Sequence, residues 1–236
     1  MVATAPVPVL AYDCDRADII IALDASDSVD ASEVQRSARD VLQAIERVRD
    51  KNPHADLSIL EAIAFTEVVE HSSRRRGGAT PVEQIEHLID AFPNLTLTFP
   101  LKTAFAPMLR YVRTRFQNRS EESRGRFPVL IVITDGRGET YDVQSAKELI
   151  NNFRFGDGFK VPPPSPMDLK AMEVVETREN EYLKEIRAFY GASMHSIAVS
   201  TGGELYPRTL WQLTSDSIER HDGVEKRIEQ LILCKV

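Results

Sequence analysis

Ile19-Ile20-Ile21-Ala22-Leu23-Asp24-Ala25-Ser26-Asp27-Ser28 is the stretch that decides the fold, because an unbroken apolar run gives way at once to carboxylates and hydroxyls. Such a run is typical of a central strand in a parallel sheet, where both faces of the strand are covered. Asp30-Ala31-Ser32-Glu33 then has the pattern of a helix start, and apolar residues recur at helical spacing up to Val48. A buried strand that leads directly into a helix predicts a βαβ unit.

The same alternation of short apolar runs and helical patterns continues along the chain. Further strands are expected at 57–65, 67–72, 128–134, 194–200 and 217–221, and further helices at 81–92, 105–116, 142–151, 169–189, 210–213 and 223–233. The first two of these strands are close enough in sequence to form an antiparallel pair, and strands joined through helices are expected to be parallel. The polar stretch 118–126 is expected to be a loop, and the Gly- and Pro-rich stretch 153–166 a loop or an insertion. No linker divides the chain, which predicts one α/β domain.

The composition excludes several classes of protein. The chain of 236 residues carries 29 Lys and Arg against 36 Asp and Glu, and its net charge of -7 disfavours a nucleic-acid-binding protein. No apolar run approaches the roughly 18 residues of a membrane-spanning helix. The segment 2–11 lacks the charged start and the length of a secretory signal. A cytoplasmic protein is therefore expected if Met1 is the natural start, and secretion stays open if Met1 was added to an excised domain.

Oxygen-bearing side chains follow two of the predicted central strands. Asp24, Ser26 and Ser28 come after the first strand, and Thr134-Asp135-Gly136 ends another. Ligands of an open parallel sheet bind beyond the carboxyl ends of its strands, and residues i, i+2 and i+4 of a strand-to-helix turn can face one point. Neither loop offers imidazole or thiolate, so the pattern selects a hard cation such as Mg²⁺. With few carboxylates around it, such an ion can accept an acidic group from a partner.

The apolar strand followed by Asp24-x-Ser26-x-Ser28 resembles the DxSxS motif of the von Willebrand factor type A (integrin I-like) domain family. In that family the motif begins a metal-ion-dependent adhesion site. The resemblance implies that Thr103, at the start of the predicted helix 105–116, is the ligand from the third loop, and that Asp135 is the last ligand. The glycines that usually precede the threonine are absent here, and Thr96 and Thr98 of the same loop remain alternatives.

The resemblance also implies a fold and a function. The fold would be a Rossmann-like, doubly wound, mostly parallel six-stranded sheet in the order 3-2-1-4-5-6, with one antiparallel edge strand and helices on both faces. An extension at 1–13 would precede a domain at 14–236, in which about 153–181 is an insertion. The function would be divalent-cation-dependent protein binding or adhesion, with Mg²⁺ (alternatively Mn²⁺ or Ca²⁺) ligated by an Asp or Glu of an extracellular-matrix or cell-surface partner. The alternative is an intracellular member of the family that assembles complexes or works with an ATPase.

Cys14 and Cys234 are the only cysteines, and they flank the predicted domain. In many extracellular members of the family, cysteines at these places join the two ends of the domain. The resemblance therefore implies a disulfide between them and favours a secreted or cell-surface protein.

Enzymatic functions are disfavoured by the residues at the same strand ends. A dinucleotide-binding enzyme would need a G-x-G-x-x-G turn after the first strand. A haloacid-dehalogenase-like phosphotransferase would need a second aspartate two residues after Asp24, where the sequence has Ser26. The five histidines are scattered, and none has a convincing nucleophile nearby. The chain is therefore not expected to be an enzyme.

Overall fold

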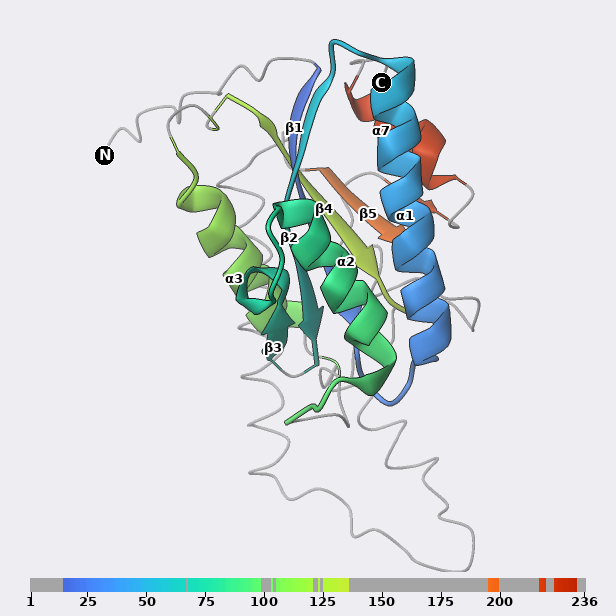
Figure 1. The fold of residues 1–236 in the computed structure, drawn as a ribbon, viewed down its shortest axis with the longest axis vertical. Helices are drawn as coiled ribbons and strands as arrows, with labels where there is room; N and C mark the ends of the chain where they lie inside the picture. Colours follow the sequence, from blue (N-terminus) through green and yellow to red (C-terminus); the bar gives the residue numbers. More distant parts are fainter. Residues whose placement is uncertain are drawn as a thin grey trace, which may run out of the picture.

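The computed structural model of the chain describes residues 15–66, 68–98, 103, 105–120, 123, 125–135, 195–199, 217–219 and 223–232. Its strands are β1 (Arg16–Asp24), β2 (Asp56–Phe65), β3 (Val69–Ser72), β4 (Phe127–Ile133), β5 (His195–Val199) and β6 (Ser217–Glu219). They form one sheet in the order β3-β2-β1-β4-β5-β6 (Figure 1). The pair β2–β3 is antiparallel, and the other pairs are parallel. The α/β class and the mostly parallel sheet with one antiparallel pair are confirmed.

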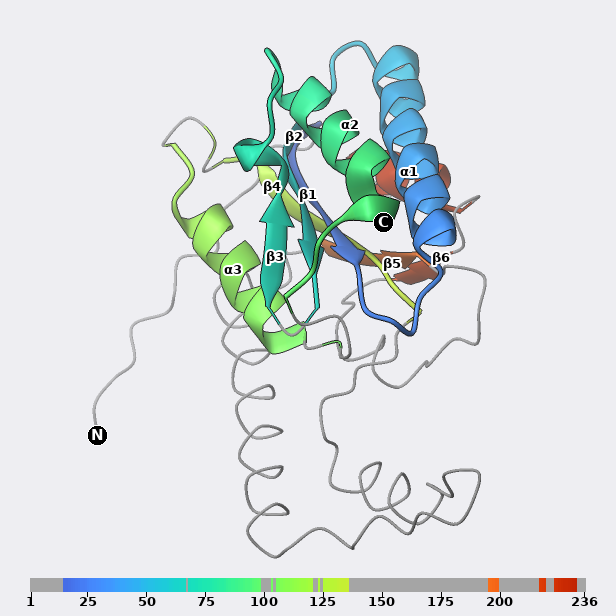
Figure 2. The same cartoon turned by 60° about the horizontal axis from the view of Figure 1, so that its bottom comes forward.

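The described helices lie on both faces of the sheet. They are α1 (Ala31–Lys51), α2 (Pro81–Ala91), α3 (Phe105–Gln117) and α7 (Val224–Ile232), with short 3-10 turns η1 (Ser73–Arg75) and η2 (Phe92–Asn94). Buried residues of α1, α2 and α7 share one core with the sheet, and those of α3 share another; Figure 2 shows α1 and α3 on opposite sides of the strands. The extension 1–13, the insertion at about 153–181 and the helices expected at 142–151, 169–189 and 210–213 lie outside the described residues.

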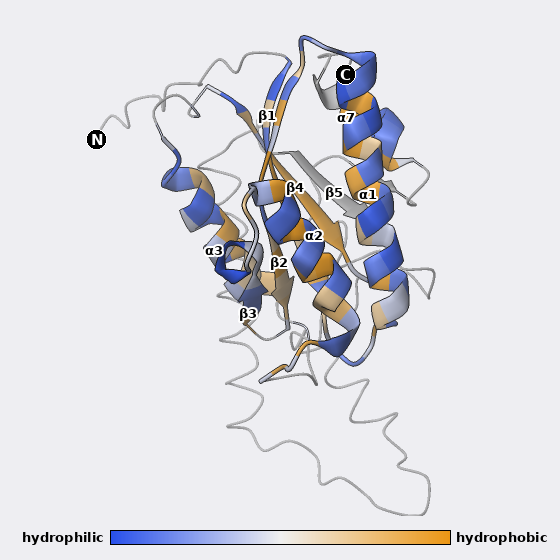
Figure 3. Cartoon of the chain, viewed as in Figure 1, coloured by the Kyte–Doolittle hydropathy of each residue, from blue (hydrophilic) through white to orange (hydrophobic). Residues whose placement is uncertain are grey.

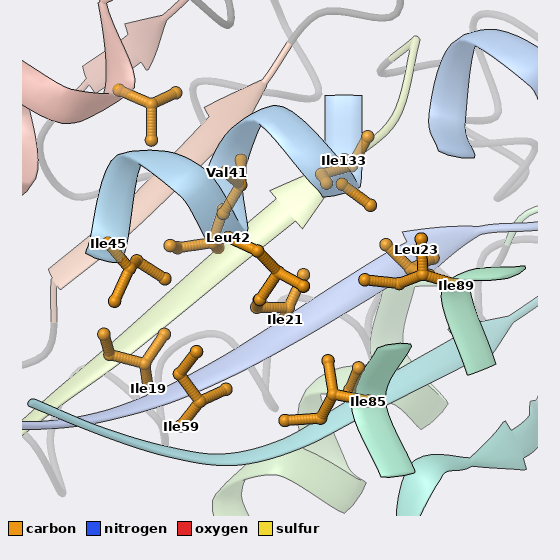
Figure 4. Packing of buried hydrophobic residues seen from close by; sticks show 14 of the residues in the cluster. Ile19, Ile21, Leu23, Val41, Leu42, Ile45, Ile59, Ile85, Ile89 and Ile133 are labelled. Carbon is orange, nitrogen blue, oxygen red and sulfur yellow. The ribbon is translucent and has the colours of Figure 1, made fainter. Parts of the chain in front are cut away.

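Side chains of β1 alternate between these two cores, as the central position of the strand requires. Ile19, Ile21 and Leu23 belong to the larger core under α1 and α2 (Figure 4). Ile20 and Ala22 belong to the smaller core under α3. In Figure 3 the strand β4 is hydrophobic along most of its length, whereas α1 is hydrophilic on its outer side. The continuous apolar run of β1 is therefore explained by burial on both faces.

A β-bulge interrupts this alternation in β2. Along the β1–β2 pair, Ile19 lies opposite Ile59, but the next residue, Ile20, lies opposite Glu61. Leu60 is thus the extra residue of a bulge, in which two residues of one strand oppose one of its neighbour. The consequence is that Glu61 shares a face with Ile20 and points toward α3, where its side chain is fully buried.

The helix starts next to the strand ends are fixed by side-chain caps. At α1, Asp30 accepts a hydrogen bond from the backbone N–H of Ser32 at 2.8 Å, while Glu33 pairs with Arg36 and does not complete the capping box suggested by the sequence. At α2, Thr80 and Glu83 do form a capping box. Each cap satisfies backbone donors that the first turn leaves open. Of the helices in the described part of the chain, none has the length and apolarity needed to cross a bilayer.

Candidate metal centre

Asp24, the last residue of β1, is the centre of a buried polar cluster at the carboxyl end of the sheet. Its side chain is fully buried. The backbone N–H of Ser26 donates to Oδ1 at 3.0 Å, and the hydroxyl of Thr134 donates to Oδ2 at 2.6 Å. The following residue is held as well, because the N–H of Ala25 donates to the carbonyl of Phe65 at the end of β2 at 2.9 Å. The carboxylate is therefore held by its own turn and by the end of β4, and the backbone beside it is held by the end of β2.

The two serines of the motif extend this cluster toward the surface. Their Oγ atoms lie 3.0 Å apart. Ser26 is buried, whereas Ser28 is exposed. The turn between β1 and α1 is closed by a hydrogen bond from the N–H of Val29 to the carbonyl of Ser26, and it is the blue loop just below α1 in Figure 1. The loop therefore leads from a buried carboxylate through one buried hydroxyl to one that faces solvent.

Thr103 is brought to Asp24 from the other side, by the start of α3. Its Oγ1 lies 3.3 Å from Oδ1 and 3.4 Å from Oδ2 of Asp24, and the residue is almost completely buried. The two alternative threonines of the same loop are exposed. The carbonyl of Thr96 bonds to the ring Nε2 of His71 on β3 at 2.9 Å. The structure therefore brings Thr103, and neither Thr96 nor Thr98, to the carboxylate.

Asp135 is a second carboxylate beside the first. It is the second residue after the end of β4 and is buried. Burial, with a smaller contribution from the negative charge of Asp135, raises the pKa of Asp24 to about 6, although the hydrogen bonds from Thr134 and Ser26 oppose the rise. The rise in pKa means that the protein does not fully compensate a charge on Asp24.

The donor set formed by Asp24, Ser26, Ser28, Thr103 and Asp135 fits a hard divalent cation. All five offer oxygen, and oxygen is the donor preferred by Mg²⁺, Mn²⁺ and Ca²⁺. Within the described ranges, no cluster of three or more His, Cys, Asp or Glu could hold a metal. A cation bound beside Asp24 would therefore need the hydroxyl groups as ligands.

Thr134 belongs to this cluster, although its sequence position did not predict a role at the site. It was expected only as the end of a strand, although its donation to Asp24 makes the shortest hydrogen bond that the carboxylate receives. The alternation of β4 contained the signal, because Thr134 is two residues beyond Val132, which faces the core under α3. Cys14 and Cys234 lie outside the described residues, and their pairing stays a prediction.

Comparisons with known proteins find similar solved structures. No protein-family model and no curated protein matches the chain. Manganese-loaded TRAP protein of Plasmodium vivax is 12% identical, with 93% of this chain and 75% of that chain covered and a TM-score of 0.53. The pilus adhesin SpaC of Lactobacillus rhamnosus GG is 14% identical, with 93% and 30% covered and a TM-score of 0.51. A von Willebrand factor type A protein of Catenulispora acidiphila is 12% identical, with 92% and 42% covered and a TM-score of 0.49.

The chain spans about half or less of the length of several of the matching structures. At 12% and 14% identity, the likeness to the Plasmodium and Lactobacillus structures concerns the fold. The strand order β3-β2-β1-β4-β5-β6, with its antiparallel edge strand, is the order that the family resemblance implies. The chain thus has the fold of the von Willebrand factor type A domains.

Proposed function

We propose that the chain is a divalent-cation-dependent protein-binding domain. Asp24, Ser26, Ser28, Thr103 and Asp135 would hold the cation, and an Asp or Glu side chain of a partner protein would complete its coordination. Mg²⁺ is the proposed ion, with Mn²⁺ and Ca²⁺ as substitutes. The proposal involves binding without turnover.

The observation that carries the proposal is the contrast between two buried aspartates of β1. Asp18 and Asp24 lie on the same face of the strand, and both are fully buried. Asp18 accepts from Arg119 at 2.9 Å and from Arg126 at 2.6 Å. Asp24 has no ion pair among the described residues and receives hydrogen bonds from hydroxyls and one backbone N–H. A buried charge needs compensation, and a bound cation would supply it at Asp24.

The residues of the proposed site have different roles. Thr134 and the N–H of Ser26 hold the carboxylate of Asp24 in one orientation. Ser28 is the exposed member of the set, which puts the accessible side of the site at the β1–α1 turn. Three of the five donors are neutral hydroxyls, so they add no negative charge around a cation. When bound, the cation supplies a positive charge to which a carboxylate of the partner can bind.

A secreted or cell-surface location is part of the proposal. Two structures of the same fold are named as a manganese-loaded protein and as a pilus adhesin, which supports metal-dependent adhesion over the intracellular alternative. Intact mass measured with and without reductant separates the two. A mass increase of two hydrogen atoms on reduction would indicate a disulfide between Cys14 and Cys234 and favour the extracellular protein, whereas an unchanged mass would favour the intracellular one.

Titration calorimetry with Mg²⁺ and Mn²⁺ at pH 7.5 tests the metal site. The unsubstituted chain is expected to bind one ion, and Asp24→Ala is expected to weaken binding at least 100-fold, because loss of an orienting partner alone costs roughly 10–100-fold. Asp27→Ala is the matched control, since Asp27 is in the same turn but exposed. Failure of the unsubstituted chain to bind either ion at millimolar concentration would refute the proposal. Capture of the partner in Mg²⁺ but not in EDTA would then identify it.

A further inference from the structure

We propose that Glu61 of β2 is a positioning residue for the metal site. It fixes α3 along the sheet and thereby sets the distance between Thr103 and Asp24. The inference rests on the proposed function, because it concerns how tightly the site binds its cation. It identifies a role for a buried carboxylate that makes no contact with the site itself.

Both oxygens of Glu61 are used in hydrogen bonds to two different elements. Oε1 accepts from the hydroxyl of Tyr111 on α3 at 2.6 Å and also from the hydroxyl of Ser72 on β3. Oε2 accepts from Nε of Arg115, one helical turn further along α3, at 2.8 Å. Burial and the hydrogen bond to Glu61 raise the pKa of Tyr111, so its hydroxyl stays a donor. Glu61 therefore links α3 to β2 at two successive turns.

These bonds restrain α3 in a way that its apolar contacts do not. The remaining buried side chains of α3 belong to an apolar cluster, which includes Met108, Leu109, Val112 and Phe116. Apolar contacts depend on area and have little directional preference, so they tolerate small sliding movements along the helix axis. Charge-assisted hydrogen bonds are short and directional. The carboxylate of Glu61 thus places a directional restraint on the axial position of the helix, in addition to the one that Arg119 supplies just beyond its end.

The metal site is sensitive to that position because Thr103 is two residues before the first residue of α3. Its hydroxyl lies 3.3 and 3.4 Å from the oxygens of Asp24, at the long end of the hydrogen-bonding range. At the same end of the helix, the rings of Phe105 and Phe65 are in tilted contact at 5.8 Å between centroids. A small shift of α3 would move Thr103 out of reach of a shared ligand.

The bulge at Leu60 turns Glu61 toward α3. A regular strand would have placed Glu61 on the face of Ile59, among the apolar side chains under α1 and α2. With the bulge, Glu61 faces α3, and the arginine and tyrosine that it needs are there. Bulges commonly redirect a side chain next to a functional site.

A thermodynamic cycle with Mn²⁺ tests the inference. The affinity for Mn²⁺ at pH 7.5 is measured for the unsubstituted chain, Glu61→Gln, Thr103→Ala and the double variant. We expect Glu61→Gln to weaken binding roughly tenfold, as for residues that orient metal ligands, and to have no further effect once Thr103 is Ala. Asp56→Asn is the control, because it also removes a carboxylate of β2 from an arginine, but at the far end of the strand. Tyr111→Phe, which loses one hydrogen bond and keeps the ring, should weaken binding less than Glu61→Gln.

The outcomes separate this inference from the proposed function. If the unsubstituted chain binds no Mn²⁺, the proposed function fails and the inference fails with it. If the unsubstituted chain binds and both Glu61→Gln and Tyr111→Phe bind equally well, only the inference is overturned. A tenfold loss that persists in the Thr103→Ala background also overturns it. Should Thr103→Ala bind too weakly to measure, the methyl NMR signal of Thr103 replaces the cycle: it must move in Glu61→Gln and stay in Asp56→Asn.

Discussion

The carboxylate of Asp24 is costly to ionise in the metal-free protein, because it is fully buried and receives its hydrogen bonds from neutral groups. Its pKa is raised to about 6 from the usual 3.8. A group whose pKa is higher in the folded state stabilises the fold at low pH, and this stabilisation is lost as the pH rises through the folded pKa. The stability of the metal-free protein should therefore depend on pH in a direction opposite to that of an ordinary paired aspartate.

We expect the free energy of unfolding in EDTA to decrease between pH 4 and pH 7.5. The contribution of Asp24 is on the order of 3 kcal/mol, since one unit of pKa corresponds to about 1.4 kcal/mol. Urea unfolding at several pH values measures it. Asp24→Asn, which cannot ionise, should remove most of the slope, and a slope unchanged by this substitution would contradict the assignment. Saturating Mg²⁺ should restore stability at pH 7.5, because ions that bind only the folded state stabilise it.

Among the elements, β2 has the least regular structure, because its bulge reverses the order in which side chains face the two cores. Leu57 and Ile59 before the bulge and Ala62 and Ala64 after it all face the core under α1. A deletion in a strand normally moves all following side chains to the wrong face. In β2, removal of Leu60 would instead leave every other residue on its present face.

Deletion of Leu60 is therefore expected to leave a folded, cooperative protein. Its cost should be about 1–2 kcal/mol, because Leu60 is only partly buried against the core under α3. Deletion of Ile63 is the matched control. If the bulge compensates for the loss of Ile63, Glu61 moves one position along β2 and its charge enters the apolar core under α1. That variant should therefore lose its cooperative unfolding transition. Thermal unfolding followed by circular dichroism compares the two, and equal loss of structure in both deletions would show that the bulge does not act as described.

At the scale of the whole molecule, the end of the sheet opposite the metal site is held by arginines. Nε of Arg126 donates to Asp18 at 2.6 Å, and Nη2 donates to the carbonyls of Ala17 at 3.1 Å and Asp56 at 2.8 Å. Arg119 completes the cluster through Asp18. Because these groups belong to the starts of β1, β2 and β4, one side chain ties together three central strands.

Arg126→Met should lower the free energy of unfolding by about 3 kcal/mol, the lower end of the range for breaking a buried ion pair, since Arg119 still compensates Asp18. The affinity of the metal site for a divalent cation should stay unchanged, because that site lies at the opposite end of the sheet. Arg36→Met provides the comparison. Arg36 pairs with Glu33 on the exposed side of α1, and its loss should cost less than about 1 kcal/mol. Urea unfolding measures both, and equal costs would argue against a structural role for the arginine cluster.

The sequence allowed us to predict at which end of the sheet the metal site lies, because strand ends and helix starts are local patterns. Asp24, Ser26 and Ser28 are adjacent in sequence, and Thr103 was selected because a helical pattern follows it. Glu61 could not be predicted, since its partners Tyr111 and Arg115 are 50 and 54 residues away. The bulge at Leu60 is visible only in the pairing with β1. Arg126 lies in a polar stretch that predicts a loop, and its burial depends on Asp18 and Asp56, which are also distant in sequence.

The two aspartates of β1 also have a consequence for how such a chain can evolve. Asp18 and Asp24 lie six residues apart on one face, or about 20 Å at roughly 3.3 Å per residue. The arginines that hold the starts of the strands together are thus well separated from the turns that would meet a partner. Insertions and substitutions in those turns can accumulate without disturbing the arginine cluster. Descendants of one ancestral chain could acquire new partners while inheriting the same means of holding the sheet together.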